Sequence, residues 1–361
     1  MAISRVEIND FLVFKGEFVT DFCPGVNVLI GENGTGKTTL LKCLYAATDT
    51  LQCKTSRYFS APGFVDSKND VHIVRSHASY EFDKEDDELF SPVAVFFSSS
   101  DHWNRIVEEF ITPYDETPHN SYIGEKLDDG YSPNSQRPNM KNKSIMIPAT
   151  EMLSHSKGFL ALCSEWKMPF DQTQIDILAK AQLPETHEVK LNAVNTLDKI
   201  KAIIGGEVVY EDDTFFVQKS NGEKVSFSLE ASGYKKLGLL WKLLRNGLLE
   251  RGAILLWDEP ENSISPELIT VLVDVLLELS RNGVQIFIAT HSELFASYFA
   301  VNRNKCDNVT FTSLYKDGEQ IKANTSDRFD FLEPNNLNAE VVNLYKKELR
   351  KGLGGAVWTL F

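Results

Sequence analysis

The sequence has few cysteines and none of the cysteine patterns that build disulfide frameworks or zinc sites. Its five cysteines, Cys23, Cys43, Cys53, Cys163 and Cys306, are odd in number, scattered along 361 residues and never spaced as Cys-x-x-Cys. Structural zinc sites and small disulfide-stabilised domains both depend on regularly spaced cysteines. The sequence therefore argues against both classes, and it fits the reducing environment of the cytoplasm.

Long hydrophobic runs are also missing. The longest ones, AILLW at 253–257 and VQIFIA at 284–289, fall far short of the roughly 20 apolar residues that a membrane-spanning helix needs. No charged-then-apolar leader opens the sequence. We expect an unprocessed cytoplasmic protein that does not associate with a membrane.

Positive charge is in deficit. The chain has 37 Lys and Arg against 51 Asp and Glu, which gives a net charge of −14. An acidic chain is not drawn to nucleic acid or to anionic lipid by its overall charge. Basic residues cluster locally at 137–143 and 346–351, where a solvated helix face is the simpler interpretation. Nucleic-acid binding is possible but not favoured.

A glycine-rich phosphate-binding pattern is present near the start of the chain. Gly-x-x-x-x-Gly-Lys-Thr runs from Gly31 to Thr38, between an apolar strand-like run and a helical pattern that starts at Lys37. Backbone N–H groups of such a loop, with the helix N-terminus, bind phosphate. Lys37 should reach the β- and γ-phosphates, and Thr38 should bind Mg²⁺. The expected nucleotide-binding residues are Gly31, Glu32, Asn33, Gly34, Thr35, Gly36, Lys37, Thr38 and Thr39.

Two adjacent carboxylates follow the apolar run at 253–257. Asp258 and Glu259 repel one another and resist burial, so the pair indicates a cation or a reaction that needs it. Asp258 would hold Mg²⁺ beside Thr38, and Glu259 would orient or deprotonate the attacking water. A surface turn that caps the next helix is the alternative, which the nearby phosphate loop disfavours.

Two further positions are candidates of lower specificity. His291 ends a third apolar run, FIATH, where its imidazole can hydrogen-bond the γ-phosphate or Glu259. Ser232 and Gly233 open a long helical pattern, which makes a second potential anion site. Taken alone, a structural histidine and a plain helix cap are the simpler interpretations of these two features.

Strand and helix patterns alternate from Ala231 onward, which predicts a parallel sheet covered by helices. Alternating segments between 58 and 97 predict antiparallel strands, and the polar stretch 112–142 predicts an exposed loop. Residues 151–166 and 170–182 read as helical, and 225–228 reads as a strand. The expected class is α/β, with a mainly parallel central sheet, an antiparallel β subdomain and an inserted helical lobe.

The segments GENGTGKTTLL, ASGYKKLGLLWKLL, AILLWDEPENSISP and IATHS, in this order, resemble the ATP-binding-cassette (ABC) ATPases. The likeness is to the soluble branch with SMC, RecF and OLD proteins, and more narrowly to the AAA-15 type. It implies ATP and Mg²⁺ as cofactors, ATP hydrolysis, a Walker A loop at 31–38 and a Walker B metal ligand at Asp258. It also implies that Glu259 is the catalytic base and His291 the switch histidine.

The same resemblance gives Ser232 and Gly233 a partner-dependent role. They stand where the family's signature motif meets the nucleotide of the opposite subunit, in a head-to-tail homodimer or a higher homo-oligomer. Glu261, Asn262 and Ser263 stand at the D-loop, which communicates between subunits. The signature reads Ala-Ser-Gly-Tyr instead of Leu-Ser-Gly-Gly. Thr150 and Glu151 are the candidates for the Q-loop position, where this chain has no glutamine.

We therefore expect one ABC-type ATPase domain over 1–361. Its predicted parts are a Walker A lobe at 1–57, an antiparallel β region at 58–147, a helical lobe at 148–205, a signature, Walker B and switch-histidine lobe at 206–310, and a C-terminal hairpin and helix at 311–361.

The expected function is a nucleotide-driven switch that controls a separately encoded effector, a nuclease or toxin. The resemblance extends to ATPase subunits of bacterial phage-defence systems of the PARIS or Septu type. A RecF- or SMC-like DNA-maintenance ATPase is the alternative, against which the acidic charge argues. A transporter subunit is a third interpretation, which the atypical signature disfavours.

Overall fold

The computed structural model describes residues 2–48, 144–166, 168–186 and 191–352, together with short strands at 93–98, 103–107, 123–124, 126–127 and 130–131. Apart from these strands, the predicted antiparallel segment that begins at 58 and the predicted loop at 112–142 lie outside the described residues. Cys53 and the basic segment 137–143 lie outside them as well.

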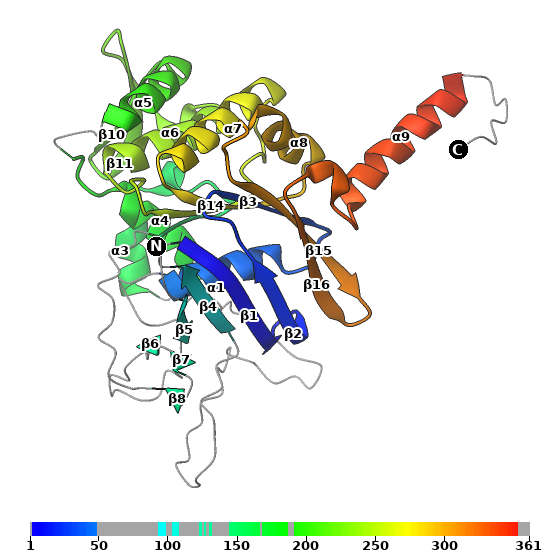
Figure 1. Cartoon of the computed structure of the whole chain (residues 1–361). Helices are drawn as coiled ribbons and strands as arrows, with labels where there is room; N and C mark the ends of the chain where they lie inside the picture. Colours follow the sequence, from blue (N-terminus) through cyan, green and yellow to red (C-terminus); the bar gives the residue numbers. More distant parts are fainter. Residues whose placement is uncertain are drawn as a thin grey trace.

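A six-stranded sheet forms the centre of the molecule (Figure 1). Its order is β16-β15-β3-β14-β13-β9, and every neighbouring pair is parallel except the β15–β16 hairpin. This confirms the predicted mainly parallel sheet. The strands are β3 (Val26–Gly31), β9 (Ser144–Ile147), β13 (Ile254–Asp258), β14 (Gln285–Thr290), β15 (Val309–Asp317) and β16 (Gln320–Ser326).

The parallel register brings three strand ends to one edge of this sheet. Ile30 of β3 lies opposite Thr290 of β14, and Ala289 of β14 lies opposite Asp258 of β13. The residues that follow β3, β13 and β14 must therefore meet at this edge. Strands β3, β13 and β14 are buried along their whole length because helices or a second sheet cover both faces.

A second, antiparallel sheet has the order β2-β1-β4-β5-β6. This confirms that antiparallel strands lie apart from the central sheet, although β1 and β2 precede the segment 58–147 for which they were predicted. Its strands are β1 (Ala2–Phe11), β2 (Phe14–Asp21), β4 (Val93–Ser98), β5 (Trp103–Val107) and β6 (Ile123–Gly124), with a separate pair β7 (Lys126–Leu127) and β8 (Gly130–Tyr131). Helix α1 (Lys37–Thr48) lies between the two sheets (Figure 1). Its side chains Leu40, Leu41 and Leu44 pack in one core cluster with residues of both.

Helices cover the opposite face of the central sheet (Figure 1). The long helical pattern that Ser232 opens forms α6 (Ser232–Arg245), and its Leu237, Leu240, Trp241 and Leu244 are all buried. The remaining elements are α3 (Phe159–Glu165), α4 (Gln172–Ala181), α5 (Leu191–Ile204), β10 (Gly206–Glu211), β11 (Thr214–Lys219), β12 (Lys224–Ser226), α7 (Pro266–Arg281) and α8 (Glu293–Asn302).

Two local predictions are wrong. Residues 151–166 do not form one helix: a 3₁₀ turn at Leu153–His155 precedes α3, and Gly158 turns the chain between them with φ +69°. The strand predicted at 225–228 ends at Ser226, and Phe227–Leu229 form a second 3₁₀ turn that buries Phe227 in the core. In both places tertiary packing overrides a short hydrophobic pattern.

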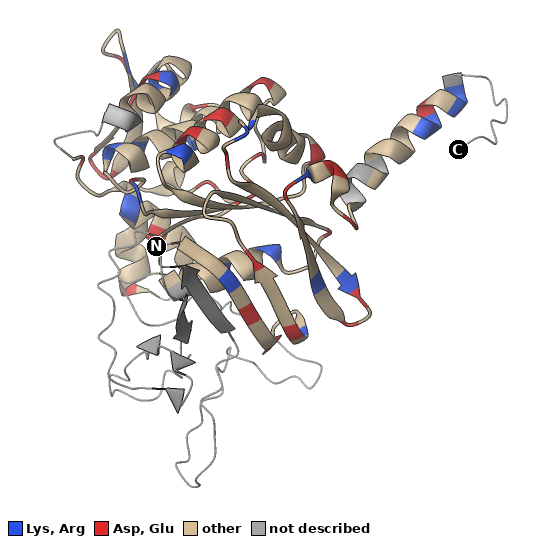
Figure 2. Ribbon diagram, viewed as in Figure 1, with Lys and Arg blue, Asp and Glu red and all other residues tan. Residues whose placement is uncertain are grey.

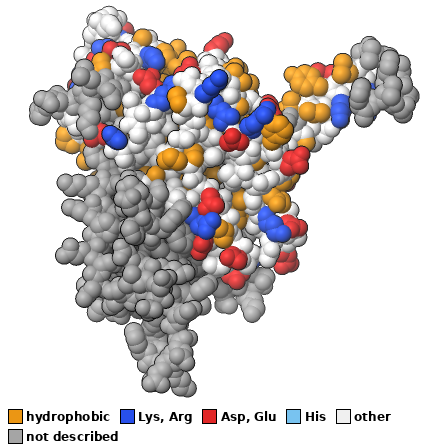
Figure 3. All heavy atoms as spheres, in the orientation of Figure 1, with side chains coloured by type: hydrophobic (Ala, Val, Ile, Leu, Met, Phe, Trp, Pro, Cys, Tyr) orange, Lys and Arg blue, Asp and Glu red, His pale blue; other side chains and the backbone are white. Residues whose placement is uncertain are grey.

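Helix α9 (Asn336–Gly352) projects from the body of the molecule (Figure 1). Leu344, Tyr345 and Leu349 are each more than half exposed on it, and Figure 3 shows hydrophobic side chains along the projection. Figure 2 shows Lys and Arg on its outer half. Among the described residues, neither α9 nor any other helix has the length and hydrophobicity that spanning a bilayer requires.

Candidate nucleotide-binding and catalytic site

The loop between β3 and α1 requires glycine at two positions. At Gly31, a Cβ atom would lie 2.3 Å from the backbone oxygen of Leu314 on the adjacent strand. At Gly36, φ is +88° and a Cβ atom would lie 2.7 Å from the ring of Phe14. Only a residue without a side chain fits such positions. The loop is thus the strand–loop–helix cradle that the sequence predicts.

Lys37 is held inside this loop and is 5% exposed. Its ammonium donates hydrogen bonds to the carbonyl oxygens of Gly31, at 2.8 Å, and Glu32, at 2.9 Å. Burial lowers the pKa of Lys37 to about 8, although the charges of Asp258 and Glu259 oppose this shift. The first turn of α1 therefore presents a buried cation at the phosphate loop.

Thr38 and Asp258 meet although 220 residues separate them. The Thr38 hydroxyl donates to Asp258 Oδ2 at 2.8 Å. Burial raises the pKa of Asp258 above its ordinary value, against the opposing effect of this hydrogen bond. A hydroxyl and a carboxylate are the oxygen ligands that Mg²⁺ prefers, so the pair fits that ion. The described residues contain no cluster of three His, Cys, Asp or Glu that could hold a metal ion.

Glu259 and His291 face one another across the ends of β13 and β14. His291 Nε2 lies 3.6 Å from Glu259 Oε1, and each side chain is about one-third exposed. Burial and the charge of Lys37 lower the pKa of His291, although Glu259 opposes them, so the neutral imidazole dominates at pH 7. A carboxylate and a neutral imidazole therefore stand beside the Thr38–Asp258 pair.

The structure adds a contact that the sequence does not predict. Glu261 Oε1 accepts a hydrogen bond from the Thr290 hydroxyl at 2.5 Å and from the His291 backbone N–H at 3.2 Å. The predicted D-loop segment is therefore tied to the strand end that carries His291. A hydroxyl directly before the histidine is the only hint of this link in the sequence.

Lys236 is a residue of the site that the sequence analysis does not single out. It lies on α6, is 8% exposed, and donates to the backbone oxygens of Glu259, at 3.0 Å, and Pro260, at 2.9 Å. The sequence signal for this role is weak, because α6 also buries a second lysine, Lys242.

The structure places Ser232 and Gly233 at the start of α6. Ser232 is exposed, whereas Gly233 packs so closely against α7 that a Cβ atom would lie 2.8 Å from Leu268. Thr150 is exposed after β9, and Glu151 bonds locally to the backbone N–H of Ser154 at 3.1 Å. Ser232 and Gly233 thus lie at a helix start, and Thr150 and Glu151 lie on the loop that follows β9.

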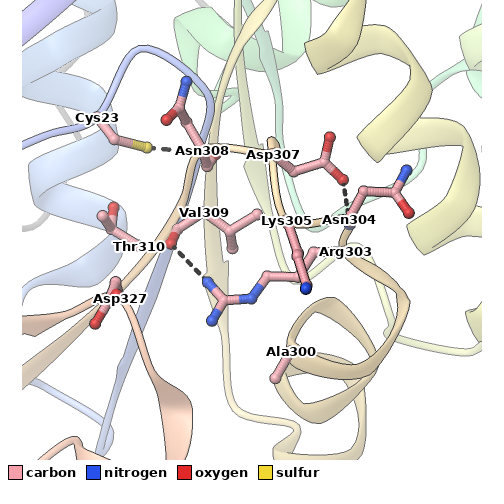
Figure 4. Close-up of a pocket in the computed structure, with 10 residues that line it drawn as sticks. All are labelled: Cys23, Ala300, Arg303, Asn304, Lys305, Asp307, Asn308, Val309, Thr310 and Asp327. Atoms are coloured by element: carbon pink, nitrogen blue, oxygen red, sulfur yellow. Dashed lines mark hydrogen bonds between the residues drawn. The ribbon is translucent and has the colours of Figure 1, made fainter.

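A pocket of about 430 Å³ lies at the other end of β3 and β15 (Figure 4). The residues that precede these strands, Cys23 and Asn308, line it together with Arg303 and Asp307. Its polar groups bond to one another: Arg303 donates to the Val309 oxygen, and Asp307 accepts from the Asn304 N–H. None of the sequence motifs lies in this pocket.

The cradle between β3 and α1, the Thr38–Asp258 pair and the Glu259–His291 pair at the edge of a mainly parallel sheet define a P-loop nucleotide-binding protein. Residues 64–297, more than half of the chain, match the family model described as "AAA domain, putative AbiEii toxin, Type IV TA system". The chain belongs to this family.

Solved structures provide a further comparison. The chain is similar to an SMC head domain from Thermotoga maritima, at 12% identity and a TM-score of 0.45, with 90% of this chain and 99% of that one covered. It is similar to an Smc head bound to the C-winged helix domain of ScpA, at 12% identity and a TM-score of 0.48, with 90% of this chain and 98% of that one covered. It is also similar to a nucleotide-free ATP-binding cassette from an ABC transporter, at 11% identity and a TM-score of 0.40, with 90% of this chain and 91% of that one covered. No curated protein sequence matches significantly.

Proposed function

We propose that this protein hydrolyses ATP in a Mg²⁺-dependent reaction. The observation that carries the proposal is the Thr38–Asp258 hydrogen bond, with Glu259 and His291 beside it. Bound Mg²⁺ would neutralise phosphate charge, held by Thr38 and Asp258. Lys37 and the loop N–H groups would bind the phosphates. Glu259 would take the proton of the attacking water, and the neutral His291 would orient that water or the γ-phosphate.

We also propose that two subunits complete each site. Ser232 is exposed at the start of a 14-residue helix, where free N–H groups and the helix dipole favour an anion. It lies on a different element from the phosphate loop of its own subunit. A head-to-tail dimer would place this helix start against the nucleotide of the neighbour, as the resemblance to ABC ATPases implies.

Mixing two inactive variants is expected to restore activity. In a dimer of one Lys37→Ala and one Ser232→Arg subunit, one composite site carries both lesions and the other carries none. Random mixing should give about a quarter of the parental rate, since half of the dimers are mixed and each has one intact site of two. Phosphate release measures the rate, and two different affinity tags verify that mixed dimers form.

The matched control mixes Lys37→Ala with Glu259→Gln subunits. Both lesions then affect residues that serve the subunit's own nucleotide, so neither composite site is intact and no activity should return. Mixed dimers of the first pair that stay as inactive as the control would contradict composite sites.

The proposed purpose is control of a separately encoded effector, a nuclease or toxin, in defence against phage. The family description, which names a toxin of a type IV toxin–antitoxin system, supports a defence setting.

Helix α9 supports a protein partner, because exposed apolar rows of this kind commonly mark interaction sites. Its exposed Leu344, Tyr345 and Leu349 have basic neighbours in the sequence, among them Lys346 and Lys347. The partner surface that fits is an apolar groove with acidic side chains along its rim.

Co-expression with the protein encoded by the neighbouring gene tests this purpose. We expect stable co-purification that depends on nucleotide, and loss of binding by about 100-fold or more in a Leu344→Glu, Leu349→Glu double variant, because two apolar anchors are removed. Val301→Glu is the matched control, since Val301 is 76% exposed on α8. Tight salt-dependent DNA binding, DNA-stimulated hydrolysis and no partner would instead favour the DNA-maintenance function.

A further inference from the structure

The backbone of Glu259 is left-handed, with φ +47°. Residues with a Cβ atom rarely adopt this conformation, and it persists only where the surroundings fix it. The conformation also sets the direction in which the Glu259 carboxylate leaves the end of β13. Whatever stabilises this turn therefore determines where the proposed catalytic base lies.

Hydrogen bonds from β14, from α6 and within the turn itself hold this turn. The Glu259 N–H donates to the Ala289 oxygen on β14 at 2.9 Å. The Glu259 carbonyl accepts from the Asn262 N–H at 3.1 Å and from the Lys236 ammonium at 3.0 Å. Lys236 also donates to the next carbonyl, that of Pro260, at 2.9 Å. Among these hydrogen-bonding groups Lys236 contributes the one side chain, and it belongs to α6.

We propose that Lys236 is a positioning residue that fixes Glu259 and couples it to the start of α6; this inference rests on the proposed ATP hydrolysis. A buried ammonium is costly unless hydrogen bonds replace its water, and these two carbonyls replace it. Glu261 and Glu259 attract the same ammonium by their charge. The turn cannot shift without removing partners from a buried cation.

The position of Lys236 on α6 gives this contact a second consequence. Ser232 lies four residues earlier, one helical turn away on the same side of the helix. A helix moves as a rigid unit over one turn, so a displacement of Ser232 by a neighbouring subunit's nucleotide reaches the Glu259 turn through Lys236. Engagement of the signature position at one site would thereby adjust the catalytic base of the other.

Substitution of Lys236 tests the inference. Lys236→Met keeps the apolar stem and removes the donors; we expect kcat to fall about 10- to 100-fold, because small misplacements of a catalytic group have effects of that size. The KM for ATP should stay within about twofold of the parental value, because Lys236 bonds to the protein backbone and is not expected to contact the nucleotide. Lys236→Arg keeps charge and donors and should restore part of kcat. Lys235→Met is the matched control, since Lys235 donates to the Ser228 oxygen, away from the turn.

Amide hydrogen exchange of residues 259–264, without nucleotide, gives a readout that does not depend on hydrolysis. Exchange should accelerate in Lys236→Met but not in Lys235→Met. If Lys236→Met does not fold, Lys236→Gln takes its place in both measurements. Parental kcat together with parental exchange would overturn the positioning role. A parental protein that hydrolyses no ATP would contradict the proposed function, and the exchange result would still decide whether Lys236 fixes the turn.

Discussion

Replacing Glu259 with glutamine is expected to abolish most ATP turnover and to leave ATP binding unchanged. The substitution preserves the size of the side chain and removes the oxygen that accepts a proton from water. General-base catalysis contributes about 10²- to 10⁴-fold, so kcat should fall by a factor in this range. Because the interaction matters mainly in the transition state, nucleotide affinity should not fall. Phosphate release and titration calorimetry measure the two quantities.

Glu267→Gln is the matched control for this experiment. Glu267 is exposed in the first turn of α7. Its substitution makes the same change in charge, but at a position that does not adjoin the Thr38–Asp258 pair. Its kcat should equal that of the parent. Hydrolysis at the parental rate in Glu259→Gln would show that another group accepts the proton.

Replacing Lys37 with alanine is expected to remove ATP binding. A hydrogen bond to a charged group contributes about 1.5–3 kcal/mol, so losing two phosphate contacts should weaken affinity by about 100-fold or more. Calorimetry measures the affinity, and the rise in melting temperature caused by ATP and Mg²⁺ should disappear with it.

Lys199→Ala serves as the control, because Lys199 is 59% exposed on α5 and pairs with Glu278 on the surface. If Lys37→Ala bound ATP with the parental affinity, the phosphates of ATP would have to bind outside the loop between β3 and α1. Since Lys37 also bonds to two carbonyls of its own loop, circular dichroism should verify that the variant remains folded.

Much of the fold could be predicted because its signals are local. The run that ends at Gly31 and the runs that end at Asp258 and Thr290 are buried strands of a parallel sheet, and their continuous hydrophobicity reflects cover on both faces. Neighbouring parallel strands end at the same edge of a sheet, so the residues that follow them must meet. The Thr38–Asp258 contact was predictable for this reason.

Other parts of the site could not be predicted, because they depend on single side chains reaching distant backbone groups. No periodicity indicates that the ammonium of Lys236 bonds to the carbonyls of Glu259 and Pro260, or that Glu261 accepts from Thr290. The left-handed turn at Glu259 was equally hidden, since a glutamate followed by proline carries no strong signal for it.

The attachment of α9 has a mechanical consequence. On β15, Ser313 and Leu314 lie opposite Ile30 and Gly31, where the phosphate loop begins. The Ser313 hydroxyl also donates to the carbonyl of Pro334, just before α9. The 17-residue helix is about 25 Å long, so a 10° rotation at its base moves its tip by about 4 Å. A small adjustment of the strand beside the phosphates would thus become a large displacement far from them, as at the end of a lever.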